Sequence, residues 1–373
     1  MTKHCKKSKH QPVISRRDFL RLAGIGAASL LVGSCQSEKA TTTQVAQPSG
    51  SVSERVAISQ ANTYDRETIT GKVRELIENL GGLGDVVKSG DSVAIKTNLT
   101  GGVESGSLRG VDPIDSFVTH PEVVRALINE VKAAGAGEIF IVEAVYEWES
   151  YRFWGYEEIA EDTGATLIDL NEYKPYKDFR EDPTGTGSFI YEKFIFNPII
   201  NDVDVFMSVS KMKNHYLAGV THTMKNLYGL VPYRFYRLNE SDEYRSGFHG
   251  VGDQTRNRLP SIIVDLNRAR PINFSLVDGI KSSQGGEGPW IDTFSAVEPG
   301  LIVAGKNSVA TDAVATALMG HDPLGEYPDT PYVRCNNHLN IAASMGLGTN
   351  RLDEIEVVGE SIEAVKTNYS PGW

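Results

Sequence analysis

Short apolar segments of strand length alternate with longer amphipathic segments along most of the chain after residue 53. The segments 92–96 and 139–142 are strand-like, and the segment 121–134 between them carries apolar residues at helical spacing. This order of elements is typical of parallel βαβ units, in which each crossover helix packs on the sheet. We therefore expect an α/β fold with a mostly parallel sheet flanked by helices.

The other predicted elements extend this pattern over one domain, residues 53–373. Predicted strands cover residues 56–59, 92–96, 139–142, 166–170, 203–209, 273–277, 301–304 and 355–358, and predicted helices cover 68–79, 121–134, 156–163, 260–268, 308–319 and 337–345. Two polar segments, 173–191 and 233–258, show little periodicity. Long irregular segments inside a compact domain are usually functional, so we expect two irregular inserts there.

The N-terminal 35 residues resemble an export signal. A lysine-rich start is followed by Arg16-Arg17, a short apolar stretch and Cys35. The order resembles a twin-arginine signal peptide with a lipobox, which implies export by the twin-arginine translocase and a lipid anchor on Cys35 at the membrane of the cell envelope. The alternative is a chance basic-then-apolar start. Residues 36–52 are rich in Ser, Thr and Gln and predict a flexible linker.

Charge and cysteine content exclude several kinds of site. Residues 1–34 hold seven basic and one acidic residue, so their removal takes the formal net charge from −11 to −17. A surface of that charge repels phosphates, and we exclude general nucleic-acid binding. Cys335 is the one cysteine of the predicted domain, which excludes an internal disulfide and an iron–sulfur cluster held by cysteines of this chain.

A dense polar segment, residues 211–229, follows the apolar strand 203–209. Polar residues after a buried strand are where α/β proteins usually place their chemistry. Lysines bind phosphate or carboxylate, and histidines ligate metals or transfer protons. The alternative is a solvated basic loop. The candidates of this segment are Lys211, Lys213, His215, Gly219, Thr221, Lys225 and Asn226.

Three further positions are candidates for the same site. Lys96 and Asn98 open a Gly-containing turn after a strand, which suits an anion but equally suits a plain βα turn. His120 precedes a predicted helix at 121, where it is either a neutral base or a capping residue. His249 lies on a predicted loop beside Gly250 and is a metal ligand or a solvated loop residue.

Several of these segments together resemble the domain-of-unknown-function 362 family. The segments that carry the resemblance are 96–98, 119–121, 211–229, 265–267, 277–279 and 310–320. The resemblance spans nearly all of the predicted domain. It implies a grouping and a link to redox partners, without an established reaction.

The spacing of His215, Gly219, Thr221 and Lys225 also resembles the N-terminal domain of the nickel-pincer lactate racemase family. That resemblance implies His215 and His120 as catalytic bases, Lys225 as the attachment point of a nickel-pincer-like cofactor, and His249 as a metal ligand. His215 is a second candidate metal ligand. The chain departs from the pattern where His222-Thr223 replaces a glycine pair.

These observations predict a cofactor- or metal-dependent enzyme that transfers a proton or hydride on a small anionic substrate. The expected binding residues are Lys96, Asn98, Lys211, Lys213, Gly219, Thr221 and Asn226. One alternative is a lipoprotein that binds an anion or metal without catalysis. Another is an accessory protein for an iron–sulfur redox partner.

Overall fold

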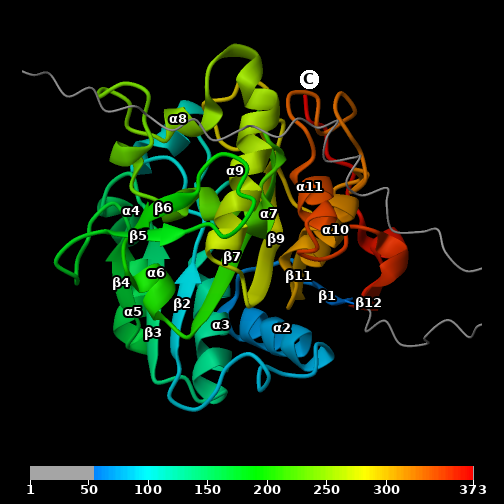
Figure 1. Cartoon of the computed structure of the whole chain (residues 1–373). Helices are drawn as coiled ribbons and strands as arrows, with labels where there is room; N and C mark the ends of the chain where they lie inside the picture. Colours follow the sequence, from blue (N-terminus) through cyan, green and yellow to red (C-terminus); the bar gives the residue numbers. More distant parts are fainter. Residues whose placement is uncertain (1–53, 373) are drawn as a thin grey trace, which may run out of the picture. The chain divides into compact units, whose positions relative to one another are not determined.

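The structure is a computed structural model that describes residues 54–372. Its strands are β1 (Glu54–Gln60), β2 (Ser92–Lys96), β3 (Glu138–Glu143), β4 (Thr166–Asp169), β5 (Arg180–Pro183), β6 (Lys193–Phe196), β7 (Val205–His215), β8 (Gly219–Val220), β9 (Phe274–Gln284), β10 (Ser295–Val297), β11 (Leu301–Gly305) and β12 (Ile355–Gly359). Ten of them form one sheet with the main order β12-β1-β11-β9-β7-β2-β3-β4 (Figure 1). Strands β5 and β6 form a separate two-stranded sheet.

The central sheet is mixed and mostly parallel. Neighbours from β9 to β4 in this order are parallel, as are β12 and β1, whereas β11 is antiparallel to both of its neighbours. Parallel strands have their carboxyl ends at one edge of the sheet. The predicted α/β fold with a mostly parallel sheet is confirmed.

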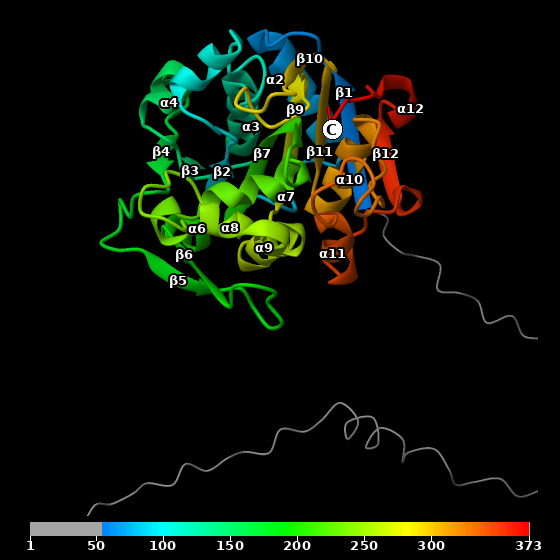
Figure 2. The same ribbon diagram turned by 90° about the horizontal axis from the view of Figure 1, so that it is seen from above.

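The helices cover both faces of the sheet. They are α2 (Arg66–Asn79), α3 (Pro121–Ala133), α4 (Glu149–Phe153), α5 (Tyr156–Thr163), α6 (Ile199–Asp202), α7 (His222–Asn226), α8 (Ser246–His249), α9 (Thr255–Ala269), α10 (Ser308–Leu318), α11 (His338–Ser344) and α12 (Ile362–Val365). Short 3-10 turns cover Val103–Leu108, Leu227–Leu230, Tyr233–Phe235, Gly252–Gln254 and Leu352–Glu354. Figure 2 shows α2 and α3 on one face of the sheet and α9, α10 and α11 on the other.

Each face has its own apolar core. Val73 of α2 and Leu127 of α3 belong to one buried cluster, and Ile263 of α9 and Val314 of α10 to another. Strands covered on both sides bury every side chain, which explains the near-continuous apolar sequence of the central strands.

The two central strands β7 and β9 are longer than the sequence predicts. The predicted strands ended at residues 209 and 277, and the following polar residues were expected in loops, but β7 continues to His215 and β9 to Gln284. Lys211 and Asp278 face each other across the two strands, and their side chains form an ion pair of 2.9 Å with both groups fully buried. The paired charges let both strands continue into polar sequence inside the protein.

The two predicted inserts are more regular than expected. The first contains β5, which pairs with β6, and the second contains α8 and the first turn of α9. Helix α9 begins five residues before the predicted start at Pro260. The carbonyl of Arg256, which lacks an N–H partner at Pro260, accepts a hydrogen bond of 2.9 Å from the N–H of Asn336 instead.

The predicted signal peptide, Cys35 and the whole of the predicted linker lie outside the described residues. Among residues 54–372, no helix is long and apolar enough to span a bilayer.

The segment before β6 is fixed to α9 by one buried carboxylate. Asp265 accepts hydrogen bonds from the backbone N–H groups of Phe189, Ile190 and Tyr191 at 2.8–3.2 Å. We predict that Asp265→Ala lowers the free energy of unfolding by about 3 kcal/mol, because three N–H groups lose their acceptor. Urea unfolding measures the change. Asp178→Ala, at an exposed position in the same insert, is the control, and equal stability of both variants would contradict the prediction.

Candidate functional site

A cavity of about 730 Å³ opens at the carboxyl ends of the parallel strands. Lys96, the last residue of β2, and His215, the last residue of β7, both line it. Glu143, at the end of β3, and Glu287, three residues after β9, complete this edge. Open α/β sheets bind ligands at this edge, which makes the cavity the candidate functional site.

The short helix α7 brings Lys225 to the cavity and is held by Asp312 of α10. The Asp312 carboxylate accepts hydrogen bonds from the N–H groups of Thr223 and Met224 and from the Thr223 hydroxyl at 2.6–2.9 Å. Burial raises the pKa of Asp312 to about 7 in spite of these donors. A carboxylate at a helix N-terminus fixes the start of the helix and therefore the position of Lys225.

Lys225 has no hydrogen bond or ion pair with any described residue. Its Nζ lies 4.1 Å from the centre of the Tyr228 ring, and both residues line the cavity. Burial lowers the pKa of Lys225 to about 7, and the nearby positive charges of Arg245 and Lys96 act in the same direction while Glu287 opposes it. The amine is therefore present in both protonation states near neutral pH.

Arg245 places a second cation beside Lys225. Its Nε donates to the carbonyl of Val231 at 2.7 Å, but one terminal guanidinium nitrogen is buried without a hydrogen-bond partner among the described residues. The guanidinium carbon lies 5.8 Å from the centre of the same Tyr228 ring, so the two cationic groups are within about 10 Å of each other. A buried donor without a partner is unusual and indicates a missing acceptor.

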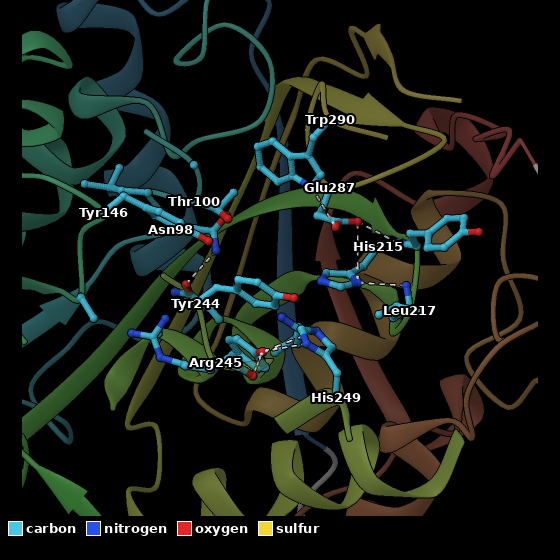
Figure 3. Close-up of a pocket in the computed structure, with 18 of the residues that line it drawn as sticks. Asn98, Thr100, Tyr146, His215, Leu217, Tyr244, Arg245, His249, Glu287 and Trp290 are labelled. Atoms are coloured by element: carbon cyan, nitrogen blue, oxygen red, sulfur yellow. Dashed lines mark hydrogen bonds and ion pairs between the residues drawn. The ribbon is translucent and has the colours of Figure 1, made fainter. Parts of the chain in front are cut away.

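His215 is held by the backbone and faces Glu287 (Figure 3). Its Nδ1 accepts hydrogen bonds from the N–H groups of Leu217 and Ala218 at 3.2 Å each and lies 3.7 Å from the Glu287 carboxylate. Burial lowers the pKa of His215 well below its usual value, and Lys225 lowers it further. A neutral ring that accepts at Nδ1 carries its proton on Nε2, so His215 is a hydrogen-bond donor through Nε2.

His249 lines the cavity from the end of α8. Both ring nitrogens lie 3.4 Å from the hydroxyl oxygen of Tyr228. This hydroxyl donates a hydrogen bond to the Arg245 carbonyl at 2.8 Å. Burial lowers the pKa of His249 to about 4. This imidazole is therefore neutral at physiological pH and able to accept a proton.

Lys96, Asn98 and Asn226 form the floor of the cavity, but they are largely occupied with one another. Lys96 forms an ion pair of 2.8 Å with Glu143 and also donates to the side-chain oxygen of Asn226 at 3.2 Å. The Asn98 amide donates to the same oxygen at 3.0 Å, which leaves its own carbonyl oxygen without a partner among the described residues.

Three predicted site residues do not line the cavity. Lys211 is bound to Asp278 and to the hydroxyl of Tyr64. Lys213 donates to the carbonyls of Phe117 and Glu287 at 2.6 and 3.1 Å. His120 caps α3 by accepting the N–H of Glu122, and its ring stacks on Tyr64 at 3.6 Å. These contacts match the alternative of a helix-capping role for His120, and they give both lysines structural roles inside the protein.

Gly219 and Thr221 also lie away from the cavity lining. Gly219 has a φ of +78°, and a Cβ there would come within 2.8 Å of the Tyr332 ring, so the glycine permits close packing rather than ligand approach. The Thr221 side chain is buried beside α7. His222 is buried with a φ of +45°, and burial lowers its pKa to about 3.

The sequence analysis missed several lining residues. Arg245 and Tyr244 belong to the predicted insert 233–258, which is rich in Arg and Tyr, and Glu287 and Trp290 belong to a glycine-rich turn after β9. Figure 3 shows these four side chains and Tyr146 around the cavity. The many Arg and Tyr residues of the insert were a sequence signal that could have pointed to Arg245. For Glu287, no neighbouring residue in the sequence distinguished it from a surface carboxylate.

The residues present do not complete a metal site. Within residues 54–372, no group of three or more His, Cys, Asp or Glu side chains is arranged to hold a metal ion. Lys225 and His249 line the same cavity, as the nickel-pincer resemblance implied, and Lys225 would be accessible to a covalently bound group. Two histidines, His215 and His249, line the cavity and do not by themselves define a nickel site, so we derive no step through a metal.

Comparison with known proteins gives a family and partial structural similarities. The family model described as "Domain of unknown function (DUF362)" matches residues 93–317, which is more than half of the chain. A thylakoid-associated protein of Synechocystis sp. is 28% identical over 268 residues, covering 72% of this chain and 75% of the relative. The predicted family grouping is confirmed.

Two solved structures are similar over part of the fold. A protein from Thermotoga maritima matches with a TM-score of 0.34 and 14% identity over 64% of this chain and 55% of that chain. The lactate racemase apoprotein from Thermoanaerobacterium thermosaccharolyticum matches with a TM-score of 0.36 and 13% identity over 66% of this chain and 54% of that chain. This chain spans about half the length of both.

The pKa of Lys225 predicts a specific dependence of stability on pH. Between pH 7 and 10.5 the unfolded chain binds this proton and the folded chain does not, so the free energy of unfolding rises with pH over that range. Lys225→Met removes this contribution. The variant should gain stability relative to the wild type at pH 7 and below, with an upper limit of about 5 kcal/mol at about 1.4 kcal/mol per pKa unit.

Urea unfolding of both proteins at a series of pH values measures this difference. The gain should shrink as the pH rises toward 10.5. Lys177→Met, at an exposed position, is the control and should follow the wild type at every pH. A gain for Lys225→Met that is independent of pH would show that the lysine is charged in the folded protein.

Proposed function

We propose that this chain, which belongs to the DUF362 family, is an enzyme that binds a small anionic substrate in the cavity and transfers a proton on it. The observation that carries the proposal is the pair of cationic side chains Lys225 and Arg245, which both line the cavity. The Lys225 amine has no hydrogen bond or ion pair with any described residue, and one terminal nitrogen of Arg245 is buried without a hydrogen-bond partner among them. An anion supplies the missing acceptors.

The burial of both cations supports an anionic ligand. Desolvation disfavours the charged forms of Lys225 and Arg245 and lowers both pKa values. A carboxylate or phosphate between them would reverse part of this effect and would form charge-assisted hydrogen bonds. The bidentate geometry of a guanidinium suits a carboxylate group, and the cavity of about 730 Å³ accommodates a small organic acid.

The titratable groups of the cavity support proton transfer. Lys225 has a pKa near 7, which suits a group that gives and takes a proton at physiological pH. His249 is neutral and can accept a proton, whereas His215 offers a proton at Nε2 to an oxygen of the substrate. Lys225 and His249 are therefore the proposed bases, and His215 is the proposed donor that stabilises developing negative charge.

Exchange of substrate protons with solvent tests this function. We predict that a panel of small hydroxy, oxo and amino acids, incubated with the protein in D₂O, contains a compound whose proton next to the carboxylate exchanges for deuterium. Proton NMR follows the loss of signal. Lys225→Met and Arg245→Gln should each slow the exchange by at least about tenfold, since each loses one contact to a charged group. Lys177→Met is the control.

Two outcomes would count against the enzyme. Exchange that persists in both variants would show that the cavity is not the site of reaction. Calorimetry measures the binding of the same acids. If an acid binds in an Arg245-dependent manner but shows no exchange, the result would favour a non-catalytic anion-binding protein.

We also propose that the protein is exported by the twin-arginine route and anchored in the cell envelope through Cys35. The support is the order of Arg16-Arg17, an apolar stretch and Cys35 in the sequence. We predict that Cys35→Ser moves the protein from the membrane fraction to the soluble fraction, as measured by immunoblotting of separated fractions. A variant that stays with the membrane would contradict the lipid anchor.

A further inference from the structure

We infer that the substrate or ligand of this cavity carries a carbonyl group as well as an anionic group, and that Lys225 condenses with this carbonyl to form an imine. The anionic group would bind Arg245. This inference rests on the proposed anion-binding function and extends it to a class of compound, the small oxo acids and anionic aldehydes. It also assigns Lys225 a covalent role.

Lys225 differs from the other buried lysines in what its amine contacts. Lys96, Lys211 and Lys213 each donate to at least two protein oxygens, and two of them face a buried carboxylate. Lys225 Nζ has no hydrogen bond or ion pair with a described residue and lies 4.1 Å from the centre of the Tyr228 ring. Its nitrogen lone pair is therefore available for attack on a carbon atom once the proton leaves.

The protonation state of Lys225 supports the same role. Burial lowers its pKa to about 7, so about half of the amine is neutral at pH 7. For an exposed lysine with a pKa of about 10.4, the neutral fraction of the amine at that pH is less than about one in a thousand. A desolvated lysine next to other cations is the environment in which lysine becomes a nucleophile toward carbonyl compounds.

Arg245 supplies the selectivity for an anionic carbonyl compound. Its guanidinium is buried, with 6% of the residue exposed, and one terminal nitrogen has no partner among the described residues. Lys225 and Arg245 both lie near the Tyr228 ring, at most about 10 Å from each other, and both line the cavity. A carboxylate bound to the guanidinium would direct the adjacent carbonyl carbon toward the amine.

The condensation balances without an oxidant or reductant. The neutral amine attacks the carbonyl carbon, a new C–N bond forms, and the amine proton moves to the oxygen to give a carbinolamine. The hydroxyl then takes up a proton, the C–O bond breaks and water leaves as the nitrogen lone pair forms the C=N bond. Loss of the remaining N–H proton, which replaces the one taken up by the hydroxyl, gives the neutral imine. His249, which is neutral and lines the cavity, is placed to accept and return the proton in these steps.

Reductive trapping with glyoxylate tests the inference. The full protein is incubated at pH 7 with glyoxylate and cyanoborohydride, and the modified lysines are identified by peptide mass spectrometry. Lys225 should be modified at least about tenfold faster than exposed Lys177, because of its larger neutral fraction. Lys225→Arg should lose this fast modification and keep the slow modification of Lys177.

A matched neutral aldehyde separates the roles of the two residues. Acetaldehyde lacks the carboxylate. In the wild-type protein, the ratio of the modification rate with glyoxylate to that with acetaldehyde should therefore be about tenfold higher at Lys225 than at Lys177. Arg245→Gln should abolish this preference while Lys225 still reacts with acetaldehyde. The comparison of aldehydes on the wild-type protein does not depend on the folding of any variant.

The outcomes distinguish this inference from the proposed function. Modification of Lys225 at the rate of Lys177 would overturn the imine. If glycolate, which has no carbonyl group, still binds in an Arg245-dependent manner, the anion-binding site remains while the imine is rejected. Equal reaction of Lys225 with both aldehydes, together with no binding of glycolate, would overturn the anionic class of the ligand as well.

Discussion

The buried ion pair between Lys211 and Asp278 is the contact on which the position of the site depends. It joins β7 and β9 where their apolar sequences end, with both groups fully buried at 2.9 Å. Loss of one partner would leave an unpaired buried charge at a cost of about 3–5 kcal/mol. Because the strands continue as neighbours beyond this pair, His215 at the end of β7 and Glu287 after β9 meet at the cavity.

The same physical rule assigns different roles to lysines of one sequence segment. Burial of a lysine is tolerated when carboxylate or carbonyl oxygens accept hydrogen bonds from its ammonium group, and Lys211 and Lys213 meet that condition. Lys225 does not meet it, although Asp312 fixes the helix that carries it. We propose that a ligand completes the contacts of the Lys225 amine and of the Arg245 nitrogen that lacks a partner among the described residues.

Periodicity was sufficient to predict the α/β fold and most of the helices, since both depend on apolar residues at regular spacing. It was insufficient for the ends of β7 and β9, because Lys211 and Asp278 are polar residues that become acceptable inside the protein only as a pair. His215, Lys225 and His249 were predicted as site residues and line one cavity. Glu287 and Arg245 were missed because their proximity arises from tertiary structure.

The pKa of the Lys225 amine is the most direct test of an uncompensated cation in the cavity. NMR of protein labelled with ¹³C at the lysine Cε, assigned with Lys225→Arg, gives this value in the free protein and in the presence of a bound small acid. We predict that the pKa of Lys225 is about 7 without ligand and rises clearly when the acid binds. A pKa near 10.5 in the free protein, unchanged by acids, would contradict this prediction.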